Sequence, residues 1–145
     1  MKKARLTKIL VEGNRDLLKK MAQQVEKRVE VKVEQPPRKG LVMLKARDSI
    51  SMQPFYLGEG LVTECAVSIQ GKFGFGAIMG EDPERSYQIA VVDAAFNARL
   101  PLVDSWIPEL EREERNIRQR HFREHVMAEH SRVQFDTMED YNDKS

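Results

Sequence analysis

Between residues 29 and 79 the sequence alternates apolar and polar residues in short runs, and this pattern constrains the fold more than any other feature. Alternation with a period of two places every second side chain on the same face of a strand. Glycine and proline separate the runs, and the connections are too short to hold a crossover helix, so neighbouring strands should pair antiparallel. The runs cover residues 29–34, 41–47, 55–57, 61–69 and 73–79. We therefore predict an α+β fold with an antiparallel sheet of four to five strands and helices that cover one of its faces.

Helical spacing and capping residues predict helices on both sides of this strand region. A first helix spans residues 3–12 and stops at Gly13, after which Asn14 can cap a second helix. Asp82 followed by Pro83 has the form of an N-cap and a first helical position. The third helix that follows has few polar residues, so we expect it to contact its surroundings on two sides.

After Pro101 the composition changes to a long, highly charged helix. We predict that this helix opens at Trp106 and Pro108 and ends near Ala128, and it holds five Glu and five Arg between positions 109 and 125. Apolar residues are sparse in it, so the helix is expected to extend as an arm into solvent or towards a partner.

The chain is predicted to form one domain over residues 1–138. Helices and sheet occupy residues 3–100, and a charged helical arm with an extended partner-docking segment occupies residues 101–138. The extended segment is predicted because alternation returns between positions 131 and 138. The acidic, polar residues 139–145 are predicted to be a disordered tail.

Composition excludes several classes of protein. Twenty-four basic residues against 23 acidic ones leave a net charge of +1, which indicates neither a nucleic-acid partner nor an anionic membrane. Cys65 is the only cysteine, so the chain can form no internal disulfide, and one thiolate cannot hold a structural zinc ion. No apolar run reaches the roughly 20 residues of a membrane-spanning helix or has the form of a secretion signal. We therefore expect a soluble, intracellular protein.

The histidines offer one candidate metal site. His121 and His125 lie one helical turn apart and could present two imidazoles to a metal, with a third ligand from His130, a glutamate or another chain. A metal-dependent hydrolase that uses His121 and His125 is therefore an alternative function. A solvated helix face with salt bridges is the preferred interpretation, and we assign no metal ligand.

Glycines and one aspartate offer two further candidates. Four glycines between positions 71 and 80 could form a loop that binds phosphate, but they alternate with apolar residues in a strand pattern, which favours close packing of the backbone. Asp93 lies on a largely apolar helix, where a buried carboxylate could serve as an acid or base. A hydrogen bond across an interface is the preferred interpretation of Asp93. We assign no catalytic or cofactor-binding residue.

Arginines recur along the charged helix, and a nucleic-acid-binding module is a second alternative function. Interleaved glutamates cancel the field that phosphate binding needs, so nucleic acid is not the preferred partner. These arginines are Arg112, Arg115, Arg118, Arg120 and Arg123.

Several apolar residues near the end of the sequence have too few apolar neighbours to form a core of their own. They need a surface to cover, which could be the sheet of this chain or another protein. We predict that they contact a partner, together with one neighbouring arginine. The candidate partner contacts are Trp106, Phe122, Val126, Arg132, Val133, Phe135 and Met138.

Ordered motifs of the sequence match a known family. The matching residues are Gly40–Arg47, Phe55–Glu59, Leu61–Cys65, Gly71, Gly74, Gly80, Asp82, Val92–Ala94 and Ser131–Met138. From about residue 14 to 138 the chain resembles PhnG, the G subunit family of the bacterial carbon–phosphorus lyase core complex. Asp136 departs from the family pattern, which usually has a second Phe at that position.

The resemblance implies a role in phosphonate catabolism within a cytoplasmic assembly of G, H, I and J subunits. In the family, this assembly displaces adenine from MgATP with an alkylphosphonate and forms α-D-ribose 1-alkylphosphonate 5-triphosphate. The nucleosidase chemistry is attributed to the I subunit, and cleavage of the carbon–phosphorus bond to the radical SAM subunit J. The chain is then expected to be an accessory subunit of a transferase complex. It would itself be non-catalytic, bind no cofactor, contact the I subunit directly, and have no nucleic-acid or membrane partner.

Overall fold

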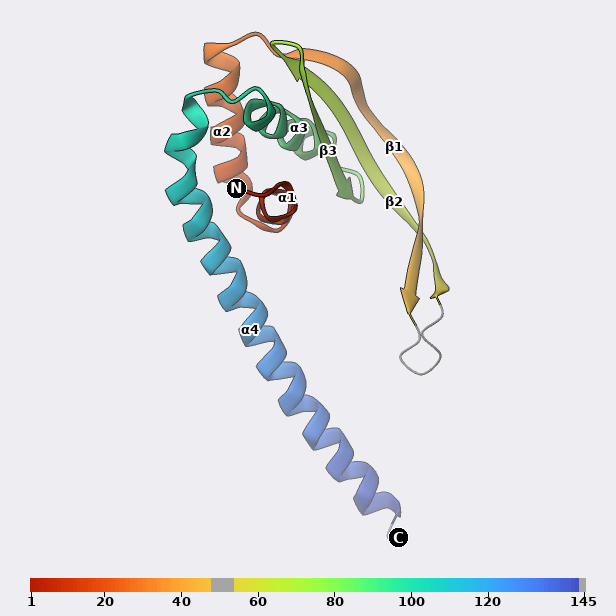
Figure 1. Ribbon diagram of the computed structural model, residues 1–145. Coiled ribbons are helices and arrows are strands. Elements are labelled where there is room, and N and C mark those ends of the chain that lie inside the picture. Colours follow the sequence, from red (N-terminus) through yellow and green to blue (C-terminus); the bar gives the residue numbers. More distant parts are fainter. Residues whose placement is uncertain (48–53, 144–145) are drawn as a thin grey trace.

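A computed structural model describes the backbone of residues 1–47 and 54–143 and the side chains of residues 1–43 and 60–126. These residues form a curved antiparallel sheet with helices gathered on one side of it (Figure 1). The predicted α+β class is confirmed, and none of the described helices is long and apolar enough to span a membrane. In chain order the elements are α1 (Lys3–Glu12), α2 (Arg15–Arg28), β1 (Lys32–Arg47), β2 (Pro54–Ile69), β3 (Lys72–Met79), α3 (Pro83–Asn97) and α4 (Leu102–Asp143).

The first two helices begin and end where local signals predict. Gly13 follows the end of α1, and Asn14 is the N-cap of α2. The Asn14 side chain accepts hydrogen bonds from the backbone N–H groups of Asp16 at 2.7 Å and Leu17 at 3.3 Å. These bonds satisfy two of the amide groups that have no partner within a helix at its start.

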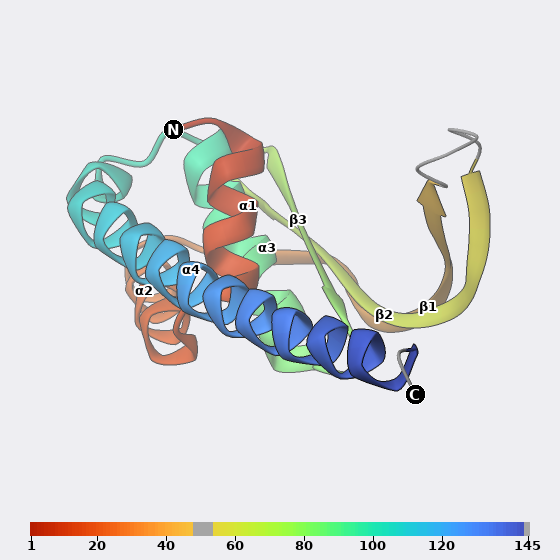
Figure 2. The ribbon, with the colours of Figure 1, turned by 90° about the horizontal axis from the view of Figure 1, so that it is seen from below.

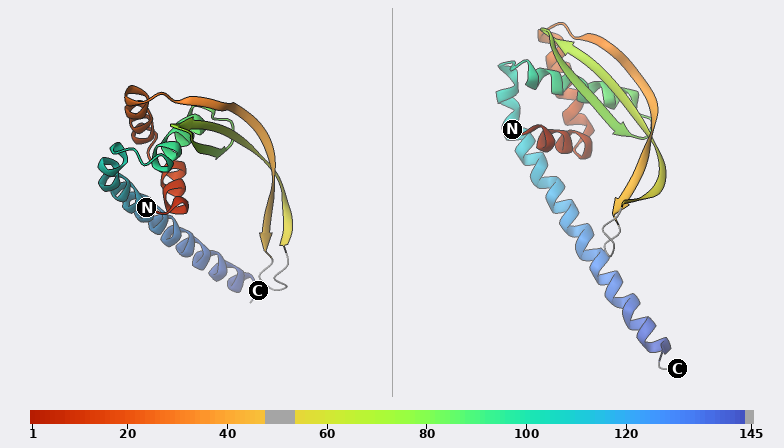
Figure 3. Two further views of the ribbon diagram at one scale, coloured as in Figure 1. Left: turned by 45° about the horizontal axis from the view of Figure 1, so that its top comes forward. Right: turned by 45° about the vertical axis from the view of Figure 1, so that its right-hand side comes forward.

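The sheet has three strands in the described residues, in the order β1–β2–β3, rather than the predicted four to five. The predicted runs 29–34 and 41–47 belong largely to β1, and the runs 55–57 and 61–69 belong to β2. Pro36 does not end β1, because β1 is an edge strand and one of its sides needs no N–H donor. One shift of register precedes Gln35 and a second spans Pro36 and Pro37, which accommodates the prolines in the ladder. The long β1–β2 hairpin is strongly curved and extends beyond α1, α2 and α3 at its far end (Figure 3).

Glycine allows α3 to pack directly on β3. A Cβ atom on Gly74 would lie 2.6 Å from the Cβ of Ala94, and one on Gly76 would lie 2.7 Å from the backbone nitrogen of Ala90. Contacts this short are not tolerated in a close-packed interior, so the helix can approach only a strand without side chains at these positions. The predicted close packing of the glycine backbone is confirmed at Gly74 and Gly76, whereas a Cβ at Gly71 or Gly80 would meet nothing within 4 Å. As expected, α3 contacts elements on two sides, the sheet and α2.

The first part of α4 belongs to the core. The helix begins at Leu102, one turn earlier than predicted, and Trp106, Leu110 and Ile117 are at most 2% exposed. The indole N–H of Trp106 donates a hydrogen bond to the side-chain oxygen of Gln24 on α2 at 2.7 Å. Figure 2 shows α4 passing across the helical layer and then extending beyond it.

The helix α4 continues without interruption to Asp143. The predicted extended segment over residues 131–138 is therefore wrong, and most of residues 139–145, predicted to be disordered, also lie in this helix. No glycine or proline follows Pro108, so the sequence contains no strong helix breaker in this stretch. Alternation over eight residues is a weaker signal than an uninterrupted helix that already extends from a buried first turn.

Candidate functional site

The face of β3 turned away from the helices carries large apolar side chains. Phe73, Phe75 and Met79 are 50%, 66% and 55% exposed, and we call these three residues the sheet patch. The rings of Phe73 and Phe75 are stacked, with centroids 6.4 Å apart. Apolar side chains that gather on a surface are typical of a site where another molecule binds.

The sequence contains a signal for the sheet patch that alternation alone does not reveal. Alternation predicts the strand β3 correctly, but it does not say which face of the strand is covered. Gly74 and Gly76 occupy the face towards α3. Because a helix can approach closely only over glycine, the aromatic residues at the alternate positions, Phe73 and Phe75, must point to the other face.

Two side chains of α3 cover the free edge of β3. Asp93 accepts a hydrogen bond from the backbone N–H of Phe75 at 3.0 Å, and the Asn97 side chain donates one to the carbonyl of Phe73 at 2.6 Å. These backbone groups would otherwise offer an edge to an added strand. The preferred interpretation of Asp93 is a hydrogen bond across an interface. The structure shows a hydrogen bond of Asp93 between α3 and β3 of this chain. Its oxygen holds the strand, which leaves the acid–base alternative without support.

A groove of about 240 Å³ lies on the outer face of the sheet beside the sheet patch, and Phe75 lines both. Arg38 and Glu64 form an ion pair in the groove at 3.6 Å. The side-chain nitrogen of Gln35 is buried there and has no hydrogen-bond partner within the described part of the chain. The outer face of the sheet therefore combines apolar rings with polar groups that can accept a further contact.

The predicted partner contacts on α4 fall into separate groups. Trp106 is buried against α2, so it is a core residue and its assignment as a partner contact is wrong. Phe122 and Val126 are 69% and 48% exposed on the part of α4 beyond the core. The side chains of the remaining candidates lie outside the described residues, and these candidates are Arg132, Val133, Phe135 and Met138.

Three carboxylates in the first third of α4 face α1 and α2. Glu114 accepts hydrogen bonds from Arg5 on α1, the shorter at 2.6 Å, and Glu109 pairs with Lys20 on α2 at 3.2 Å. Glu113 accepts a hydrogen bond at 3.1 Å from the backbone N–H of the α2 N-cap. The hydrogen bonds from the Arg5 guanidinium hold the pKa of Glu114 below its usual range. These contacts attach the first third of α4 to the N-terminal helices.

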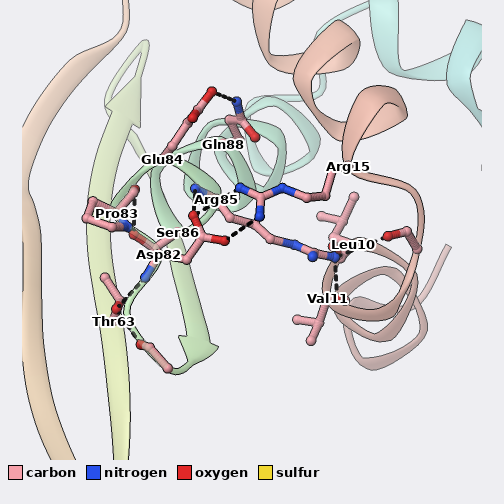
Figure 4. A network of polar contacts seen from close by, with 12 residues as sticks. Leu10, Val11, Arg15, Thr63, Asp82, Pro83, Glu84, Arg85, Ser86 and Gln88 are labelled. Carbon is pink, nitrogen blue, oxygen red and sulfur yellow. Dashed lines mark hydrogen bonds and ion pairs between the residues drawn. The ribbon is translucent and has the colours of Figure 1, made fainter.

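A polar network connects the start of α3 to the end of α1 (Figure 4). The Arg85 guanidinium donates hydrogen bonds to three backbone carbonyls at the end of α1, and burial, followed by the nearby Arg15, lowers its pKa. Asp82 caps α3 by accepting from the backbone N–H of Arg85, and it pairs with Arg15 at 3.0 Å. The start of α3 thus already holds a carboxylate of this chain, which supports a structural role for the glycine-rich region and not a phosphate loop.

The histidines of α4 point to different surroundings. His121 lies 3.6 Å from the carboxylate of Glu12 on α1, whereas His125 is exposed to solvent. Among the described residues, no group of three or more histidine, cysteine, aspartate or glutamate side chains is placed to hold a metal ion. The side chain of His130 lies outside those residues. The metal-dependent hydrolase has no observation in its favour in this part of the chain.

Comparisons with known proteins point in one direction. The family model described as phosphonate metabolism protein PhnG matches residues 1–139. The PhnG subunit of alpha-D-ribose 1-methylphosphonate 5-triphosphate synthase from Rhizobium meliloti (strain 1021) is 32% identical over 75 residues. That similarity covers 51% of this chain and 48% of the relative, so the chain spans about half the length of the curated relative that it matches.

Proposed function

The chain belongs to the PhnG family of phosphonate metabolism proteins, and on this premise we propose that it is an accessory subunit of the carbon–phosphorus lyase core complex. The relative in Rhizobium meliloti supports the proposal, because its name describes it as a subunit of a ribose methylphosphonate triphosphate synthase. The proposed partners are the H, I and J subunits, and the I subunit is the direct one.

The proposed reaction is the displacement of adenine from MgATP by an alkylphosphonate, which gives α-D-ribose 1-alkylphosphonate 5-triphosphate. In this proposal the I subunit carries out the chemistry, and this chain holds it in a competent shape. The role of Asp93 agrees with a non-catalytic chain, because its carboxylate is engaged by the N–H of Phe75. MgATP is then a substrate of the complex and is bound by the other subunits.

The sheet patch is the observation that carries the proposal. Burying one large apolar side chain contributes roughly 1.5–3 kcal/mol relative to leaving it exposed. Phe73, Phe75 and Met79 each keep at least half of their surface in water, so a partner that covers all three would gain several kcal/mol. The edge beside them is already covered by α3, which favours a partner that packs on the face and does not add a strand.

Co-expression of this chain with the H, I and J subunits tests the proposal. We expect the wild-type chain to co-purify with them and to be required for release of adenine from ATP in the presence of methylphosphonate. Combined Phe73→Ser and Phe75→Ser should remove the chain from the complex with only a small loss of its own stability, because both rings lie on the face turned away from the core and are at least half exposed. Val33→Ser, at a residue that is 45% exposed on β1, is the matched control and should bind normally.

The outcomes separate the function from the surface. Full adenine release by H, I and J without this chain would contradict the proposed function. Normal binding by the Phe73 and Phe75 double variant would instead show that the sheet patch is not the contact.

A further inference from the structure

In the first third of α4, most acidic side chains lie on one face and two arginines on the other. The equal numbers of Glu and Arg cancel along the sequence, but Glu109, Glu113 and Glu114 point to α1 and α2, where they accept hydrogen bonds. Arg112 and Arg115 are exposed to solvent instead. The expected neutralisation by glutamate is seen at Arg118, which pairs with Glu114, whereas Arg112 and Arg115 form no ion pair within the described residues.

Helical geometry places the exposed arginines on one line with exposed apolar residues. An α-helix turns by roughly 100° per residue, so positions separated alternately by three and four residues form a single stripe. This stripe lies on the side of α4 opposite Ile117, which is buried. We call it the arginine–apolar stripe, and its members are Arg112, Arg115, Gln119, Phe122 and Val126.

The stripe carries two arginines at one end, with Glu111 one helical turn before Arg115, and an apolar surface at the other end. Within the described residues, neither Arg112 nor Arg115 has a carboxylate within 4.0 Å. Arg118, beside the stripe, is paired with Glu114 at 3.3 Å, so its charge is already compensated. Phe122 and Val126 are 69% and 48% exposed.

We propose that the arginine–apolar stripe binds a helix of a partner subunit that has apolar residues at helical spacing and carboxylates at one end. This inference rests on the proposed function, because it assigns a surface of α4 to one of the partners. Spacing of three and four residues is the pattern by which two helices pack side by side. The partner's carboxylates would pair with Arg112 and Arg115, and its apolar residues would cover Phe122 and Val126.

Two other occupants fit the stripe less well. A nucleic acid would use the two arginines, but it would leave Phe122 and Val126 without the apolar cover that a helix gives them. A second copy of this chain packed parallel would set the arginines against each other, and one packed antiparallel would set them against Phe122 and Val126, with no carboxylate to pair with them. The combination of positive and apolar residues therefore favours an acidic, amphipathic helix.

Photo-cross-linking in the co-expressed complex tests the inference. Gln119→p-benzoylphenylalanine places the reactive group in the middle of the stripe. We expect it to form a cross-link with one segment of the H, I or J subunit that has Asp or Glu beside apolar residues at helical spacing. The same replacement at Lys19, exposed on α2, is the control and should not label that segment.

Charge reversal gives a second, independent readout. Combined Arg112→Glu and Arg115→Glu should weaken association with the partner subunits at least tenfold, on the order expected when charge pairs at an interface are broken. Combined Lys19→Glu and Lys27→Glu changes the net charge equally on an exposed face of α2 and should leave the affinity within about twofold.

The results distinguish this inference from the proposed function. Cross-linking of position 119 to nucleic acid or to a second copy would overturn the partner helix, as would unchanged affinity of the Arg112 and Arg115 double variant. Both of these results concern the surface of α4 only. If the wild-type chain co-purifies with H, I and J in the same experiment, the proposed function stands. If the wild-type chain does not associate with these subunits, both the function and the inference fall.

Discussion

Substitution of Gly76 by alanine should push α3 away from the sheet. The added Cβ would lie 2.7 Å from the backbone nitrogen of Ala90 and closer still to the carbonyl oxygen of Ser86. Both are backbone atoms of a packed helix, so they cannot move aside by rotating a side chain. The strain must instead be relieved by a shift of α3, which is buried between β3 and α2.

The magnitude follows from two opposing effects. Overpacking a well-packed core costs about 1–3 kcal/mol, and the upper end applies here because only backbone atoms are in contact. Alanine also reduces the conformational entropy of the unfolded chain, and this effect offsets about 0.4–1 kcal/mol of the overpacking cost. We therefore expect Gly76→Ala to lower the free energy of unfolding by about 2 kcal/mol, which corresponds to a fall in Tm of about 4–8 °C in a chain of this size.

Urea unfolding of Gly76→Ala and of a matched control measures the effect. Gly40→Ala is the control, because a Cβ there meets only the Val62 side chain at an ordinary 3.6 Å. The control should change the free energy of unfolding by less than about 0.5 kcal/mol. Equal midpoints for the two variants would refute the conclusion that glycine allows α3 to pack on β3.

Two further predictions concern α4. Trp106→Ala should lower the free energy of unfolding by about 3–5 kcal/mol because the indole is buried. Phe122→Ala should lower it by less than about 0.5 kcal/mol because its ring is exposed. If chemical denaturation gave the reverse order, the conclusion that Trp106 is a core residue would be wrong. The pKa of Glu114 is lowered by Arg5, so the bond between them stabilises the fold above the usual carboxylate pKa and is lost as the pH falls through the lowered value. Unfolding midpoints between pH 7 and pH 3 should therefore fall more in the wild type than in Glu114→Gln, and parallel curves would count against this contact.

Local signals predict the elements whose ends depend on a few neighbouring residues. Asn14 and Asp82 accept capping hydrogen bonds as expected, because an N-cap needs only the amides of the next turn. The number of strands could not be predicted in this way. Whether Pro36 ends a strand depends on whether a neighbour needs its N–H, and that depends on the position of the strand in the sheet.

The candidate site depends even more on tertiary packing. One face of α4 has apolar residues at helical spacing, which are Trp106, Leu110 and Ile117. A helix with so few apolar residues among many charged ones is also typical of a solvated arm. Only the positions of α1 and α2 show that this face is buried and that the opposite face carries Phe122. The same packing decides which charges of α4 are paired and which are free to meet a partner.

The most direct test of the subunit proposal is affinity purification of this chain from its native host, grown with a phosphonate as the sole phosphorus source, followed by mass spectrometry. We predict recovery of the H, I and J subunits in stoichiometric amounts with the chain. Recovery of the folded chain alone under these conditions would contradict its role as a subunit of the complex.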